Sequence, residues 1–180
     1  MVSHNVNHKY NELINSLKNK DKIRVLFVCL GNICRSPAAH GVMQAVVDAE
    51  GANHRFMIDS AGTGNYHTGE LPDKRMRVHA QRRGYNLTHR ARQFRTSDFD
   101  DFDIIIGMDA YNLSTLRSKA RTVDDEKKII AMGDFINSAS RYDHVPDPYY
   151  EGSEGFELVL DLLEDATRNL YDALSENNQW

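Results

Sequence analysis

The sequence predicts an α/β fold, in which helices cover both faces of a parallel β-sheet. Four runs rich in strand-forming residues lie at 23–29, 55–60, 102–107 and 128–132, and helical patterns separate them. Strands that alternate with helices indicate βαβ units and hence parallel strands. The length of 180 residues suits one domain with a single core.

The first strand is expected at 23–29, because this run is almost continuously apolar, as in strands buried on both faces. A helix is expected next, since apolar residues recur at helical spacing from Ala38 to Ala49. Ser36 suits the N-cap of this helix and Pro37 its first position. An amphipathic helix is expected at 155–174. Residues 1–22 are predicted to be an extension, either mobile or a short helix at 10–17.

Composition excludes several classes of protein. The longest apolar run, at 25–30, is too short to cross a membrane, and residues 1–21 lack a signal-peptide pattern, so a cytoplasmic protein is expected. Two cysteines exclude a disulfide scaffold and a four-cysteine zinc site. A net charge of −4 argues against nucleic acid as the main partner. The eight histidines are scattered, and neither a metal nor a cofactor is expected.

The segment after the first strand carries the clearest chemical signal. It reads Cys29, Leu30, Gly31, Asn32, Ile33, Cys34, Arg35, Ser36 and Pro37. Ligands of open α/β sheets bind beyond the carboxyl ends of the strands. Backbone amides of such a loop can converge on an anion, and the positive end of the following helix points into the same space. Arg35 adds a fork that matches two phosphate oxygens.

Gly31 and Asn32 are expected to shape this loop, and Cys29 is expected to carry its chemistry. Gly31 permits a left-handed or crowded backbone, and Asn32 can brace the loop by hydrogen bonds. The helix end and Arg35 favour the thiolate of Cys29, and Ser36 is placed to donate a hydrogen bond to it. Cys29 is therefore the candidate nucleophile for attack on phosphorus, through a cysteinyl-phosphate.

A leaving aryloxide or alkoxide needs a general acid, and the candidate is Asp147. It precedes the last predicted helix and lies between Pro146 and Pro148, which stiffen the backbone. Tyr149 and Tyr150 follow and can wall a pocket for an aromatic substrate. The same carboxylate can then activate the water that hydrolyses the intermediate.

These residues resemble the low-molecular-weight protein tyrosine phosphatase family, over about 23–174. The matching segments are 28–37, 59–63, Pro72-Asp73 with Arg75, Phe102-Asp103, Met108-Asp109 and 147–150. The resemblance implies a doubly wound, four-stranded parallel sheet and metal-independent hydrolysis of phosphotyrosine in protein substrates. It implies that Cys29 is the nucleophile, Asp147 the acid and Tyr66 a rim residue that flanks the substrate with Tyr149. Phosphate and other oxyanions are expected to inhibit.

The predicted organisation is an extension at 1–22, a phosphatase domain at 23–175 and a tail at 176–180. Two other functions stay open, an arginine phosphatase and a binding module, whereas arsenate reduction is excluded. Arginine phosphatases of this fold carry Thr where this chain has Ile33, which favours an aromatic substrate. Arsenate reductases need further cysteines, and none follows Cys34. A phosphate-dependent binding module without turnover is the alternative of another kind.

Several side chains have two interpretations each. Cys34 is either a buried packing residue or a thiol that traps oxidised Cys29 as a disulfide. Asp109 either pairs with Arg35 or caps a helix, and Ser60 either contacts the loop near Asn32 or is a plain structural serine. His89 is expected to be structural, and His40 and His67 are expected to be bystanders.

Overall fold

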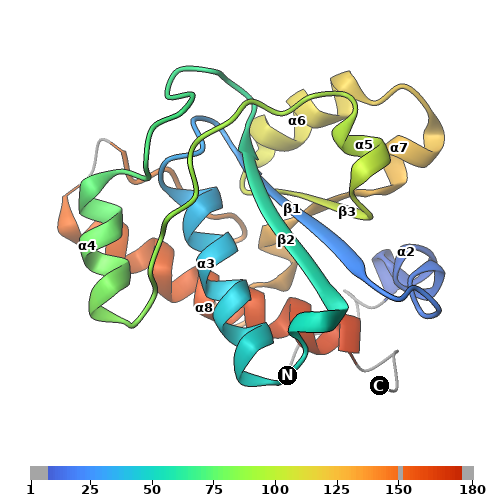
Figure 1. Ribbon diagram of the computed structural model, residues 1–180, viewed down its shortest axis with the longest axis horizontal. Helices are drawn as coiled ribbons and strands as arrows, with labels where there is room; N and C mark the ends of the chain where they lie inside the picture. The colour runs from blue at the N-terminus through green and yellow to red at the C-terminus, as the bar shows by residue number, and fades with distance from the viewer. Residues whose placement is uncertain (1–7, 150–151, 176–180) are drawn as a thin grey trace.

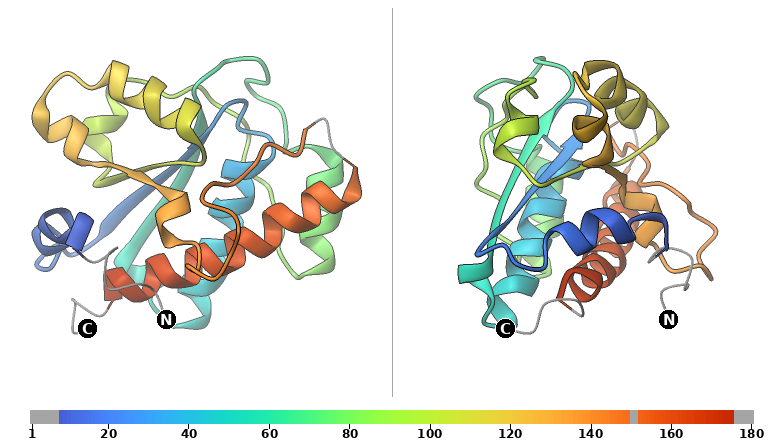
Figure 2. Two further views of the ribbon diagram at one scale, coloured as in Figure 1. Left: turned by 180° about the vertical axis from the view of Figure 1, so that it is seen from behind. Right: turned by 90° about the vertical axis from the view of Figure 1, so that its right-hand side faces the viewer.

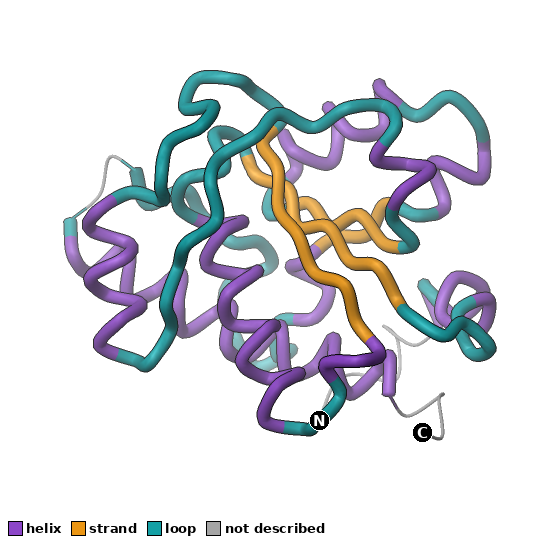
Figure 3. Tube along the Cα trace, in the orientation of Figure 1, coloured by secondary structure: helices purple, strands orange, loops and turns teal. Residues whose placement is uncertain are grey.

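The computed structural model describes residues 8–149 and 152–175, and a four-stranded parallel sheet forms its centre (Figure 3). The strand order is β2-β1-β3-β4. The strands are Ile23–Cys29 (β1), Phe56–Gly62 (β2), Ile104–Gly107 (β3) and Ile129–Ala131 (β4). The predicted α/β class with a four-stranded parallel sheet is confirmed. The strands differ from the predicted runs by one to two residues at most of their ends.

Helices cover both faces of the sheet (Figures 1 and 2). One face carries α3 and α8, and the other carries α5 and α6. Helices α4 and η2 pack against α8 and contribute to the same core. The bounds are Asn11–Ser16 (α2), Arg35–Ala49 (α3), Asn53–Arg55 (η1), Lys74–Arg82 (α4), Asp98–Asp101 (α5), Ala110–Lys119 (α6), Val123–Lys127 (α7), Met132–Phe135 (η2) and Ser153–Ser175 (α8).

Strand β1 explains why the sheet needs two helical layers. Val25 and Phe27 belong to the core beneath α3 and α8, whereas Leu26 and Val28 belong to the core beneath α5 and α6. All four are fully buried. Successive residues of a strand point to opposite faces, so an apolar run must be covered from both sides.

Helix α3 begins two residues earlier than the sequence predicts. It starts at Arg35, and Cys34 occupies the N-cap position. Ser36 is therefore not the cap, and Pro37 is not the first helical residue. The hydroxyl of Ser36 is engaged by Asn32 and Cys29 instead, which leaves it unable to cap the helix.

Helix α2 packs the start of the chain against the β4 edge of the sheet. Ile14 and Leu17 are buried in the core. The ring of Tyr10 stacks on Phe135 with a centroid distance of 5.9 Å. The amide of Ala131 in β4 donates a 3.2 Å hydrogen bond to the Tyr10 hydroxyl. This contact satisfies a backbone donor of an edge strand.

At the opposite edge of the sheet, the connection 83–97 between α4 and α5 meets the carboxyl end of β2, as Figure 3 shows. The amide of Gly62 donates to the carbonyl of Arg92 at 2.8 Å, and the amide of Phe94 donates to the carbonyl of Gly62 at 2.7 Å. The connection therefore pairs with the last residue of this edge strand through backbone hydrogen bonds.

The topology reverses between β1 and β3, because β2 lies on one side of β1 and β3 and β4 lie on the other. Open α/β sheets bind ligands at this reversal, beyond the carboxyl ends of the strands. The loops after Cys29 and Gly107 meet there. Among the described residues, no helix has the length and apolar character needed to cross a membrane.

Candidate active site

A cavity of about 310 Å³ opens at the carboxyl end of β1. It brings together most of the residues that the sequence singled out. Its walls are Cys29, Leu30, Gly31, Ile33, Cys34, Arg35, Tyr66, His67, Asp147 and Tyr149. Asn32 and Ser36 are fully buried and lie behind the wall. Tyr150, predicted to bind substrate, lies outside the described residues.

The Cys29 sulfur has a hydroxyl beside it. Ser36 Oγ lies 3.0 Å from Cys29 Sγ and accepts a 2.7 Å hydrogen bond from Asn32 Nδ2. Because Asn32 occupies an acceptor position of this oxygen, the hydroxyl proton remains available for the sulfur. The carbonyl of Ala61 lies further away, at 3.3 Å. The arrangement can stabilise a thiolate.

Asn32, and not Gly31, adopts the left-handed backbone of the loop, with φ of 56°. Gly31 therefore lacks the left-handed backbone, but its position is crowded as expected, because a Cβ there would lie 3.1 Å from His67 Cδ2. Asn tolerates this conformation better than most residues. Its side chain also holds it in place: Nδ2 donates to Ser60 Oγ at 3.0 Å, and Oδ1 accepts from the Arg92 amide at 3.0 Å. The predicted contact between Ser60 and Asn32 is confirmed.

The loop carbonyls are bonded to neighbouring segments. Thr63, Gly64 and Asp73 donate their amides to the carbonyls of Cys29, Leu30 and Ile33 at 2.8–2.9 Å. In a planar trans peptide, the carbonyl and the following amide point in opposite directions. The amides of residues 30, 31 and 34 are therefore directed away from those segments, as an anion-binding loop requires.

Arg35 lies at the base of the cavity, with 2% of its side chain exposed. Nη1 donates to Asp109 Oδ2 at 2.6 Å and to the Val145 carbonyl at 3.2 Å. Nη2 lies 3.4 Å from Asp147 Oδ2. Burial lowers the pKa of Arg35, but Cys29 and the two carboxylates outweigh it, so the pKa is raised. The guanidinium is a permanent cation.

Asp109 fulfils both of its interpretations. Its Oδ2 holds Arg35, and its Oδ1 accepts from the Asn112 amide at 2.8 Å, which caps α6. The Asn112 side chain accepts from the Asp109 amide at 3.2 Å and completes a capping box. Helix α6 thus anchors the carboxylate that orients Arg35.

Aromatic rings form the rim of the cavity. Tyr66 is 72% exposed. The Tyr149 ring lies 6.1 Å from the His67 ring and 5.6 Å from the Arg75 guanidinium. His67, expected to be a bystander, is part of the wall, and Glu70 holds its Nδ1 at 2.8 Å. No pattern in the sequence pointed to this, because the loop 63–73 brings His67 to the site only through its fold.

Asp147 reaches the cavity from the loop before α8. Its carboxylate is 40% exposed, and Oδ1 accepts from the Tyr149 amide at 3.0 Å. Cys34 shares the cavity wall but is buried, and burial raises the pKa of its thiol, with Asp73 contributing. A buried thiol of this kind stays protonated.

The fold and the site define a class: an α/β phosphatase with a cysteine, an arginine and a carboxylate around one loop. The family model "Low molecular weight phosphotyrosine protein phosphatase" matches residues 24–180. The chain belongs to this family.

Named relatives and solved structures agree with this family. A low molecular weight protein-tyrosine-phosphatase of Streptomyces coelicolor is 43% identical over 154 residues, 85% of this chain and 94% of that protein. A crystal structure of a protein tyrosine phosphatase from Entamoeba histolytica, with Hepes in the active site, is 43% identical with a TM-score of 0.83, covering 86% and 98% of the two chains. A Drosophila arginine phosphatase structure is 29% identical with a TM-score of 0.80, covering 85% and 98%.

Proposed function

We propose that this enzyme hydrolyses phosphotyrosine in proteins through a cysteinyl-phosphate. The observation that carries the proposal is the meeting of Cys29, Arg35 and Asp147 in one cavity, although 112 residues separate Arg35 from Asp147. Residues 23–175 would form the phosphatase domain. Residues 1–22 would be an extension and residues 176–180 a tail.

In the first step, the Cys29 thiolate attacks phosphorus. An S–P bond forms while the P–O bond to the tyrosine breaks, and Asp147 gives its proton to the leaving phenolate. Arg35 and the loop amides hold the three remaining phosphate oxygens, on which charge is spread in the transition state. Ser36 stabilises the thiolate before attack.

In the second step, a water molecule attacks the phosphorus of the intermediate. The Asp147 carboxylate takes a proton from that water, a new P–O bond forms and the S–P bond breaks. The products are inorganic phosphate, the Cys29 thiolate and protonated Asp147. Asp147 thus acts as an acid in the first step and as a base in the second. The starting protonation states are restored as a result.

The rim favours an aromatic ester. Tyr66 and Tyr149 flank the cavity mouth and can stack on a phenyl ring. Ile33, which lines the cavity, offers an apolar side chain and no hydroxyl for a guanidinium. The Entamoeba structure holds Hepes, a sulfonate, in its active site, which supports inhibition of this chain by phosphate and other oxyanions.

A panel of phosphopeptides tests the proposal. Phosphotyrosine, phosphoserine and phosphoarginine peptides of one sequence are incubated with the wild type and with Cys29→Ser, and released phosphate is measured. We expect turnover of phosphotyrosine alone and none by Cys29→Ser. Phosphoarginine turnover would favour the function of the Drosophila relative instead. Tight binding without turnover by the wild type would identify a binding module.

A further inference from the structure

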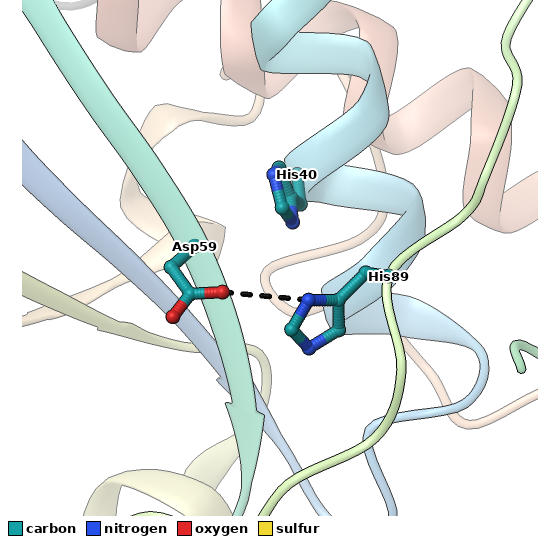
Figure 4. Close-up of side chains that lie close together, drawn as sticks. All are labelled: His40, Asp59 and His89. Atoms are coloured by element: carbon teal, nitrogen blue, oxygen red, sulfur yellow. Dashed lines mark ion pairs between the residues drawn. The ribbon is translucent and has the colours of Figure 1, made fainter. Parts of the chain in front are cut away.

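Three potential metal ligands from distant parts of the chain converge behind the phosphate loop. They are His40 on α3, Asp59 on β2 and His89 on the connection 83–97, and Figure 4 shows them facing one another. One ligand atom from each lies within 4.8 Å of the others. None of the three lines the catalytic cavity. Among the described residues, these three side chains form the group of His, Cys, Asp or Glu whose ligand atoms lie close enough together to hold a metal.

The hydrogen bonds of His89 identify which of its nitrogens is free to bind a metal. The side-chain oxygen Oδ1 of Asn32 accepts from the Arg92 amide, and an oxygen in this role must also accept from His89 Nε2, at 3.0 Å. Nε2 therefore carries a proton. In the neutral ring, Nδ1 then presents a lone pair, and it faces Asp59 Oδ1 at 3.4 Å. Asp59 Oδ1 accepts from the Ser60 amide at 2.8 Å and keeps a second lone pair, so a cation can bind between His89 Nδ1 and this oxygen.

His40 supplies a second imidazole at the same point. Its ring centroid lies 5.4 Å from that of His89. Its Nδ1 is buried and has no hydrogen-bond partner among the residues that the structure describes. A buried imidazole nitrogen without a partner is available as a metal ligand.

Asp59 is also arranged like a metal-binding carboxylate. Its Oδ1 faces His89, whereas its Oδ2 accepts from Arg92 Nε and Nη2 at 3.2 and 3.1 Å. Monodentate ligation through Oδ1 would leave the ion pair with Arg92 intact. Hydrogen bonds to the outer side of ligands, such as Asn32 to His89 and Arg92 to Asp59, are typical of metal sites.

We propose that His40, Asp59 and His89 bind one divalent transition metal, with Zn²⁺ as the best match. Two imidazoles and one carboxylate are a ligand set that zinc takes with water in the fourth position. Tetrahedral Zn²⁺ places ligand atoms about 3.3 Å apart, given bonds of about 2.0 Å. The ligand atoms, which lie within 4.8 Å of one another, must therefore draw closer together when the metal binds.

The ion also has a route to the site. A groove of about 280 Å³ between α3 and the connection 83–97 is lined by both histidines, with Gln44, Asp48 and Tyr85 among its other walls. Metal entry and a bound water are therefore possible from solvent without opening the core. A bound metal would hold His89 in place, and through His89 it would hold the side chain of Asn32. The site thus couples metal binding to the stability of the phosphate loop.

Calorimetry with Zn²⁺ tests the proposal. The full chain is used as Cys29→Ser, after treatment with EDTA, so that the catalytic sulfur cannot bind the metal. We expect one equivalent of Zn²⁺ to bind and to raise the melting temperature. His40→Gln and Asp59→Asn, each in this background, should lose at least tenfold in affinity. His54→Gln, a change at an exposed histidine on η1, should bind like the parent.

Co²⁺ provides an independent readout in the same background. Visible d–d bands of a four-coordinate ion should appear and should be lost in His40→Gln. Absence of stoichiometric binding, or equal binding by His40→Gln and His54→Gln, would overturn the proposal. Because these measurements use a chain without the catalytic thiol, their failure would leave the phosphopeptide results unaffected.

Discussion

Arg35 donates a 2.6 Å hydrogen bond to Asp109. Asp109 lies between β3 and α6, so the cation at the base of the cavity is held from the carboxyl end of the strand next to β1. Asp109→Asn keeps the cap on α6 but removes the charge that orients Arg35. We expect kcat/KM to fall and the inhibition constant of phosphate to rise about tenfold, the equivalent of 1.4 kcal/mol. Steady-state kinetics with and without phosphate measure both. Unchanged constants would show that Arg35 is oriented without Asp109.

Asp147→Asn removes the proposed acid but keeps the shape of the side chain. We expect kcat to fall by roughly 10²–10⁴ for phenyl phosphate, whose leaving group needs a proton. The loss should be much smaller for para-nitrophenyl phosphate, because its leaving group is already stable as an anion. Rates for a series of aryl phosphates measure this dependence. An equal loss across the series would contradict the role of Asp147 as acid.

Two variants of Asn32 distinguish the effect of backbone strain from the effect of the side-chain hydrogen bonds. Asn32→Gly suits the positive φ but removes the contacts to Ser36, Ser60 and His89, whereas Asn32→Ala adds strain of about 1–2 kcal/mol. We expect both variants to lose about ten- to a hundredfold in kcat/KM, as for other misplaced catalytic groups. Only Asn32→Ala should lose clearly more in melting temperature. If Asn32→Gly retains full activity, the side-chain network is unnecessary.

The contact between α4 and α8 should depend on pH. Arg83, and also His79 at 2.6 Å, hydrogen-bond to Glu157 and lower its pKa. A lowered pKa means that this contribution is present above the unfolded pKa of Glu, about 4.3, and is lost as the pH falls through the folded value. Glu157 is 40% exposed, so the contribution is about 1 kcal/mol or less.

Thermal unfolding of Glu157→Gln against wild type measures this contribution. We expect the variant to melt about 2–4 °C lower at pH 7, and the difference to disappear at low pH. Glu154→Gln, at an exposed position in the first turn of α8, is the control and should change little. A difference that persists at pH 2 would show that the charge of Glu157 is not the cause.

Replacing Cys34 tests whether oxidation of Cys29 is reversible. A peroxide-oxidised Cys29 is expected to condense with Cys34 into a disulfide, which a thiol reductant reverses. Burial raises the pKa of the Cys34 thiol, so this step should be slow near pH 7. We expect Cys34→Ala to recover less activity than wild type when reductant follows peroxide. Equal recovery of the two would rule out a trapping role.

Much of this site could be predicted from sequence, because its chemistry is concentrated in one short segment. The run from Cys29 to Ser36 follows a strongly apolar strand, and such local order is visible in the amino-acid sequence. Asp147 could be proposed from its prolines and its tyrosines. The helix limits were predicted less well, because Ser36 bonds to Asn32 and Cys29 instead of capping α3.

Contacts that depend on tertiary packing were not predictable. Asp109 had two interpretations, and only its hydrogen bonds with Arg35 and with the Asn112 amide show that both hold. His67 joins the cavity wall through a loop without secondary structure. His40 and His89 are 49 positions apart in the numbering, so their ligand spacing resembles no metal motif. Helix α3 and the connection 83–97 bring them together.

Segments that are not strands form hydrogen bonds with both edges of the sheet. Gly62 of β2 pairs with the connection 83–97, and the Tyr10 hydroxyl accepts a hydrogen bond from the outward-facing amide of Ala131 in β4. Exposed strand margins are templates on which other chains add and aggregate. Shortening the chain to begin at Ile23 would therefore do more than remove buried apolar surface: it would leave β4 open to pairing with a second molecule, and self-association would accompany the loss of stability.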